Sequence, residues 1–207
     1  MGLNKKINIE NLKENRAVSE AREKLRDDRT RGIVKWVFEI IVTLRNMLLV
    51  FAVLVAISAF QTVTLQESAM EPTYSVSEKF FVNRALYKVS SPKRGDVIVF
   101  KTSASDSAAL HIRRVIGLPG ETVQVKDGKI YINGKVYEEN GAYQDMTDGG
   151  LANSAITLES GEYFVLGDNR NNSEDSRFSD IGNISKKYIV GKVWFTVSPK
   201  NKIGFIK

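Results

Sequence analysis

The most hydrophobic part of the chain is a single run in its N-terminal third. Apolar residues begin near Ile33, and no charge occurs between Asn46 and Gln66. About 20 apolar residues span the core of a bilayer, so the run predicts a membrane anchor of one transmembrane helix over residues 36–62. A cleaved signal peptide and a buried core helix are the alternatives. The run starts too far along the chain for a signal peptide, and no clear small-residue cleavage site follows it.

A charged arm, residues 1–35, precedes the anchor. Between Asn4 and Lys35 it contains ten Lys and Arg residues against six acids. Acids and bases alternate at helical spacing from Glu20 to Arg31, which suits an exposed helix or a disordered arm. Because basic flanks of a membrane helix tend to stay in the cytoplasm, we expect the arm inside the cell and the C-terminal part outside the plasma membrane.

From residue 63 onward the pattern changes to short β segments, rich in Val, Ile and Phe, and no helix of normal length is evident. Asp127-Gly128 and Asn133-Gly134 are turn pairs typical of tight hairpins. The segments are too short and too close for βαβ units, so residues 63–207 predict a mainly β domain of short antiparallel strands. The expected strands cover residues 79–84, 96–101, 110–116, 122–126, 129–133, 135–137, 162–166, 188–197 and 203–206, and residues 139–154 are expected to form a loop.

Composition excludes several kinds of site. The 207 residues include no Cys and a single His, His111, which excludes disulfides, thiolate zinc sites and histidine-rich metal sites. We expect no cofactor and no metal. The formal net charge is +6, but the basic residues are spread along the chain. No basic-aromatic groove or finger motif is visible, so a nucleic-acid partner is not expected.

Four stretches stand in a recognisable order behind the predicted anchor. They are Met70–Thr73 (Met-Glu-Pro-Thr), Arg94–Phe100 (Arg-Gly-Asp-Val-Ile-Val-Phe), Arg113–Glu121 (Arg-Arg-Val-Ile-Gly-Leu-Pro-Gly-Glu), and Gly167–Arg177 with Ile189–Lys192 after it. Over roughly residues 45–200 the chain resembles the type I signal peptidase family. Its members are membrane-anchored serine endopeptidases that remove signal peptides from exported proteins. The resemblance implies an external signal-peptidase-like β domain behind one transmembrane helix.

The resemblance implies a serine nucleophile directly before Met70 and a lysine general base directly before Arg114. A serine hydroxyl needs an adjacent base, and a lysine can serve only if burial makes it neutral near working pH. Ala69 and Arg113 stand at these positions, and a guanidinium does not lose its proton in a protein. Glu67 stands where the family typically has Ser or Gly, and its carboxylate would repel a developing oxyanion.

Two nearby residues offer an unorthodox pair, Ser68 as nucleophile and His111 as base. Neighbouring side chains of an extended chain point to opposite faces, so Ser68 should face away from where Ala69 points. His111 precedes Arg113 by two residues on the same strand face, about 6.6 Å away along the strand. An ion pair between Arg113 and Glu67 is a further hypothesis, in which two departures from the family replace the catalytic pair.

The remaining motif residues are expected to support the site. By resemblance, the residue matching Ser173 helps to position the lysine in active relatives. The charged residues of the fourth stretch are expected to form a network of ion pairs and hydrogen bonds. The expected site-support residues are Glu67, Met70, Pro72, Thr73, Asp168, Arg170, Ser173, Asp175 and Arg177.

Three functions compete on this evidence. The favoured one is a signal peptidase I homologue, naturally inactive, that takes an extended peptide by β-addition beside Thr62–Gln66 and Ala108–Ile112. Resemblance to the signal-peptidase-like proteins of Gram-positive pilus loci implies exported preproteins or pilin as partners, and a role in pilus or surface-protein assembly. The second is an active type I signal peptidase that uses Ser68 and His111. The third is a membrane protein whose domain is only structural.

Overall fold

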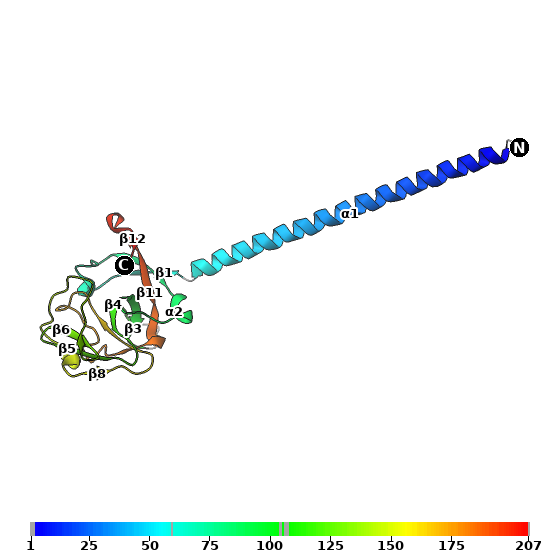
Figure 1. Cartoon of the computed structure of the whole chain (residues 1–207). Helices are drawn as coiled ribbons and strands as arrows, with labels where there is room; N and C mark the ends of the chain where they lie inside the picture. Colours follow the sequence, from blue (N-terminus) through cyan, green and yellow to red (C-terminus); the bar gives the residue numbers. More distant parts are fainter. Residues whose placement is uncertain (1–2, 59, 104, 106–107, 207) are drawn as a thin grey trace. The chain divides into compact units, whose positions relative to one another are not determined.

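The computed structural model describes residues 3–58, 60–103, 105 and 108–206. The chain divides into two compact units, Met1–Ala56 and Ile57–Lys207. The first unit is part of one long helix, α1 (Leu3–Ser58), drawn in blue to cyan in Figure 1. Within it, Val18–Val55 is a candidate membrane span by length and composition.

The helix ends before the limit expected for the anchor. Residues 36–62 were expected to form the membrane helix, but α1 ends at Ser58 and residues 60–62 belong to strand β1 (Phe60–Thr64). The strand has the sequence Phe-Gln-Thr-Val-Thr, which favours extended backbone. Its backbone groups pair with strand β2 (Lys79–Asn83), a partner that the local hydrophobic run could not reveal.

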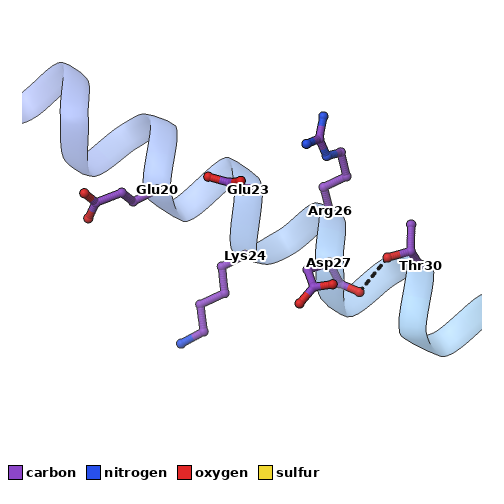
Figure 2. Close-up of a pocket in the computed structure, with 6 residues that line it drawn as sticks. All are labelled: Glu20, Glu23, Lys24, Arg26, Asp27 and Thr30. Carbon is purple, nitrogen blue, oxygen red and sulfur yellow. Dashed lines mark hydrogen bonds between the residues drawn. The ribbon is translucent and has the colours of Figure 1, made fainter.

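The charged arm forms the N-terminal part of α1, the first of the two expected alternatives. Figure 2 shows six side chains that project around a surface hollow of this helix: Glu20, Glu23, Lys24, Arg26, Asp27 and Thr30. The hydroxyl of Thr30 donates a hydrogen bond of 2.8 Å to the carbonyl of Asp27. Exposed ion pairs along the helix, such as Arg31 with Asp27 at 2.8 Å, stabilise it only slightly. The hollow therefore reflects spacing along an exposed helix and contains none of the residues that the motifs single out.

The second unit is built from two antiparallel sheets (Figure 1). The larger sheet has the order β1-β2-β11-β3-β4-β9-β10, with β12 paired to β11, and the smaller one has the order β7-β6-β5-β8. The mainly β prediction is therefore confirmed. The remaining strands are β3 (Val97–Lys101), β4 (Leu110–Gly117), β5 (Thr122–Lys126), β6 (Lys129–Ile132), β7 (Lys135–Val136), β8 (Ile156–Thr157), β9 (Glu162–Leu166), β10 (Ile184–Ser185), β11 (Ile189–Ser198) and β12 (Gly204–Phe205).

Short helical turns connect these strands. They are η1 (Ser68–Met70), α2 (Leu86–Val89), η2 (Gly150–Asn153), η3 (Lys186–Tyr188) and η4 (Lys200–Lys202). Both predicted hairpin turns are present, because Asp127, Gly128, Asn133 and Gly134 all have positive φ, between 51° and 77°.

The core fixes the position of turn η1. Met70, at the end of η1, has no exposed surface and belongs to a hydrophobic cluster with Leu65, Phe80 and Ile112. These residues come from the segment before η1 and from strands β2 and β4. The turn that carries the nucleophile position is thus held to the large sheet by a buried side chain.

Gly191 offers a test of the packing between β11 and β2. A Cβ atom at this position would lie 2.4 Å from the carbonyl oxygen of Asn83, too close for either backbone to accommodate. We predict that Gly191→Ala lowers the free energy of unfolding of the full chain in detergent by about 2 kcal/mol, measured by chemical denaturation. Gly204→Ala is the control, because nothing lies within 4 Å of its Cβ position. Equal stability of the two variants would contradict the observed packing.

Candidate active site

Turn η1 presents the nucleophile position from a rigid backbone. The N–H of Glu71 donates to the carbonyl of Ser68 at 3.0 Å and closes the turn. The loop after β9 holds the turn from the other side, since the N–H of Asn169 donates to the carbonyl of Ala69 at 2.9 Å. The side-chain amide of Asn169 also donates to the carbonyl of Ser68 at 3.2 Å. Ala69, 3% exposed, therefore has a fixed backbone but no group that can react.

Gly167 explains how the two segments approach so closely. A Cβ atom there would lie 2.5 Å from the carbonyl oxygen of Ala69 and 2.2 Å from the hydroxyl oxygen of Ser173. Only a glycine fits between these groups without displacement. The start of the fourth motif thus places Ser173 beside the nucleophile position.

The ion pair expected between Glu67 and Arg113 is present, and His111 joins it. Nη2 of Arg113 lies 2.6 Å from Oε2 of Glu67, and Nδ1 of His111 lies 2.9 Å from Oε1 of the same carboxylate. The His111 contact is close but too oblique to count as a hydrogen bond. His111 and Arg113 share one face of β4 because side chains alternate along a strand. The Glu67 carboxylate therefore lies against the position expected for the general base.

Arg113 is the largest fully buried side chain, with 1% of its surface exposed. Besides Glu67, its donors reach two backbone carbonyls, that of Glu174 at 2.8 Å from Nε and that of Ile112 at 2.8 Å from Nη1. A buried guanidinium is tolerated when its charge and its N–H groups find partners, as here. Its position in the domain is therefore tied to Glu67.

The two partners lower the pKa of Glu67 to about 2. Burial by itself raises this pKa, because it disfavours the charged carboxylate. The contacts with His111 and Arg113 outweigh burial, since both stabilise the negative charge. The Glu67 side chain is therefore a fixed carboxylate at neutral pH.

The two hydroxyl groups near the site have different surroundings. The hydroxyl of Ser68 accepts a hydrogen bond of 3.1 Å from the side-chain amide of Asn172. Ser68 and His111, the alternative pair, form no hydrogen bond with each other in the described part of the chain. The hydroxyl of Ser173 is buried, and no hydrogen-bond partner for it occurs among the described residues.

An open groove of about 810 Å³ joins these groups. It is lined by Gln66, Glu67, Ser68, Ala69, Val76, Arg113, Asn171, Asn172, Ser173, Glu174, Phe178, Ser179 and Asp180. The structure thus brings Ala69, Arg113, Glu67 and Ser173 together, whereas His111 is not part of the groove wall. No cluster of three or more His, Asp or Glu side chains suited to a metal ion is found in the described ranges.

Buried ion pairs support the groove. The charged residues of the fourth motif were expected to form a network, and two of them pair with residues outside that motif. Asp168 pairs with Arg114, the neighbour of the base position, through contacts of 2.8 and 2.6 Å. Arg170 pairs with Glu139 from the long loop, at 2.6 Å between Nη2 and Oε1. The guanidinium of Arg170 also lies 4.2 Å from the ring centre of Tyr143. The fourth motif is therefore fixed to β4 and to the 139–154 loop.

Asp175 and Arg177 pair within the motif itself. Nε of Arg177 lies 2.8 Å from Oδ1 of Asp175, and both side chains are almost fully buried. Asp175 also accepts the N–H of Gly167 at 3.1 Å, and Arg177 donates to the carbonyl of Arg170 at 2.6 Å. These contacts shape the loop that carries Ser173.

Pro72 and Thr73 lie elsewhere. Both are exposed and line a neighbouring hollow together with Arg114 and Tyr143, away from the groove of Ala69. Sequence reasoning did not single out Arg114, Glu139, Tyr143 or the asparagines of the fourth motif as site residues. The position of Arg114 directly after Arg113 could have identified it as a site residue. Glu139 and Tyr143 lie in a loop whose partners are distant in sequence, so no local pattern identifies them.

Mostly antiparallel β sheets that follow an N-terminal apolar helix define the architectural class of this protein. Residues 35–198 match the family described as signal peptidase, peptidase S26. A signal peptidase I of Bacillus licheniformis is 32% identical over 183 residues, which cover 85% of this chain and 94% of the relative. A signal peptidase I of Bacillus amyloliquefaciens is 34% identical over 191 residues, with 87% and 96% coverage. The chain belongs to the signal peptidase family, peptidase S26.

A crystal structure of a signal peptidase I from Enterococcus faecalis V583 is also similar, with 32% sequence identity. The match has a TM-score of 0.41 and covers 51% of this chain and 98% of that one.

A substitution at Arg113 tests how much its ion pair with Glu67 contributes to the stability of the fold. We predict that Arg113→Ala lowers the free energy of unfolding of the full chain by about 3 kcal/mol, because Glu67 loses its main partner and two backbone carbonyls lose their donor. Thermal and chemical denaturation in detergent measure the loss. Arg84→Ala, which removes an exposed arginine of the same domain, serves as the control. A melting temperature unchanged by Arg113→Ala would show that the pair is unimportant.

The pKa of Glu67 predicts a pH dependence. A folded-state pKa lowered from 4.5 to about 2 stabilises the fold above pH 4.5, and this stabilisation is lost as the pH falls toward 2. We expect Glu67→Gln to remove about 1 kcal/mol of the decline in stability between pH 5 and pH 2, a figure reduced from the full shift because the carboxylate is partly exposed. Glu71→Gln is the matched control. The expectation fails if both variants follow the wild-type pH profile.

Proposed function

We propose that this protein is a membrane-anchored signal peptidase homologue that binds extended polypeptides and does not cleave them. The observation that carries the proposal is the contact of Glu67 with Arg113 at the place where the family's reaction needs a serine and a neutral lysine. It is supported by the burial of Arg113 and by the place of both partners in the groove that contains Ala69.

In this arrangement, acyl transfer lacks the nucleophile, the base and the oxyanion stabilisation that it needs. Ala69 has no hydroxyl, and Arg113 cannot accept a proton. A tetrahedral intermediate would form its oxyanion close to the charged carboxylate of Glu67, where electrostatic stabilisation is normally a large part of catalysis. The hydroxyl of Ser68 accepts a hydrogen bond from Asn172 and forms none with His111 in the described structure, which argues against a substitute nucleophile.

The strand edges beside the groove suit an extended peptide. β1 pairs with β2 only and is an edge strand of the described sheet. β4 pairs with β3 along its whole first half, but its contacts with β9 begin at Arg114, so Leu110–Ile112 have one open edge within the described residues. A peptide strand can add to such edges through backbone hydrogen bonds. The expected contact segments Thr62–Gln66 and Ala108–Ile112 both include residues of these edges.

We further propose that the client is an exported preprotein or a pilin, and that the protein assists pilus or surface-protein assembly. Support comes from the relatives, which are named signal peptidase I, and from resemblance to pilus-locus members that lack the catalytic pair. In this arrangement residues 1–35 are a cytoplasmic arm, the apolar part of α1 is the anchor and the β domain lies outside the plasma membrane.

The test of inactivity is incubation of the full chain in proteoliposomes with a secretory preprotein and with a pilin precursor. We expect no cleavage by the wild type. We expect cleavage to appear in Glu67→Ser/Ala69→Ser/Arg113→Lys, while Ala69→Ser alone remains inactive because it lacks a base. Wild-type cleavage at the signal-peptide site that is lost in Ser68→Ala would overturn the proposal.

Binding of a client without cleavage can be measured separately by photo-cross-linking. The chain has no Cys, so a single Ser179→Cys places a photo-cross-linker on the groove wall. We expect this variant to capture the client, and Thr102→Cys, outside the groove, to capture none. Equal capture by both positions would contradict a specific groove.

A further inference from the structure

A second hollow of the external domain is strongly basic. It has a volume of about 610 Å³, and its cations are Arg84, Lys88, Lys101, Lys186 and Lys187. No carboxylate is among the residues that line it in the described structure. Its cations come from segments far apart in sequence: the end of β2, helix α2, the end of β3 and turn η3.

Several of these cations have no internal counter-charge. Arg84, Lys88 and Lys187 are exposed, and none of them forms an ion pair with a described residue. Lys186 donates to the hydroxyl of Ser91 at 3.2 Å, and Lys187 lies 4.8 Å from the ring centre of Tyr188. The buried arginines of the domain, by contrast, each have a carboxylate partner, as do Arg94, Lys192 and Lys202. Like charges that converge on one concave surface repel each other unless an anion joins them.

The position of the hollow relative to the chain suggests which anion. Phe60, the first residue of β1, pairs with Asn83, the last residue of β2, and Arg84 follows directly. Helix α1 ends at Ser58, two residues before Phe60, and two residues extend the chain by at most about 7 Å. Along the covalent chain, the β1 edge beside Arg84 therefore comes directly after the candidate membrane span, which ends at Val55. Phosphate groups of a lipid surface are the anions that membrane anchoring would place within reach.

We propose that this basic hollow binds the phosphate groups of anionic membrane lipids. The ammonium groups of the lysines act as point charges toward phosphate, and the guanidinium of Arg84 can bind phosphate through two N–H groups. The hydroxyl groups of Ser103 and Tyr188, which also line the hollow, add hydrogen-bond donors to phosphate oxygens. The site is independent of the groove at Ala69 and of whether that groove cleaves peptides.

The test uses the full chain in nanodiscs. A single Thr102→Cys, adjacent in sequence to Ser103 but not one of the residues that line the hollow, carries a fluorophore, which is possible because the chain has no Cys of its own, and nitroxide headgroup lipids quench it on contact. We expect quenching to be about threefold stronger when a third of the phosphatidylcholine is replaced by phosphatidylglycerol. Arg84→Gln/Lys88→Gln/Lys187→Gln should return quenching to the level in pure phosphatidylcholine.

The control removes the same number of charges elsewhere on the domain. Lys126→Gln/Lys129→Gln/Lys135→Gln changes exposed lysines of the small sheet and should retain the effect of phosphatidylglycerol. Melting curves of both triple variants establish that each is folded. The proposal is overturned if phosphatidylglycerol has no effect, or if both triple variants lose it equally. It is also overturned if soluble glycerophosphate abolishes the effect, since the site would then take a free phosphate and not a lipid surface.

Discussion

The contact between Glu67 and Arg113 is the constraint on which the rest of the site depends. The guanidinium of Arg113 is 1% exposed, and a buried charge of this kind destabilises the fold unless a partner of opposite charge lies beside it. Once Arg113 occupies the base position, Glu67 is the group that balances its charge at 2.6 Å. The two residues therefore depend on each other, since a change at Glu67 leaves the buried charge of Arg113 without its carboxylate and a change at Arg113 removes the main partner of the half-buried Glu67.

The scaffold around the pair does not depend on catalytic chemistry. Met70 holds turn η1 to the core, and Asn169 bonds the carbonyl of Ala69. The charged residues of the fourth motif are satisfied by Arg114, by Glu139 and by one another, none of which involves the nucleophile or base position. Each of these contacts stabilises the same backbone whether or not the site can react. The domain can thus lose its reactive groups and still present a groove and open strand edges.

The sequence predicts the mainly β fold and the approximate strands because alternation and turn pairs are local signals. It also predicts the partners Glu67 and Arg113, since the family's order of motifs places them in one site. It does not predict β8 and β10, which have two residues each, or β1, whose first residues continue the hydrophobic run of the expected anchor; all three pair with strands distant in sequence. Nor does it predict Glu139 as the partner of Arg170, because an ion pair between residues 31 positions apart leaves no local pattern.

The surroundings of the Ser173 hydroxyl differ from those that the family resemblance implies. It is buried without a hydrogen-bond partner in the described structure, and an unsatisfied buried group of this kind costs about 1–3 kcal/mol. Arg113 directs its donors to Glu67 and to two backbone carbonyls, and none to Ser173. The resemblance to the family implies that the matching residue of active members helps to position a lysine, whose ammonium has three donors. We propose that Ser173 keeps the place it would have beside a lysine base, since the guanidinium of Arg113 is satisfied by other partners.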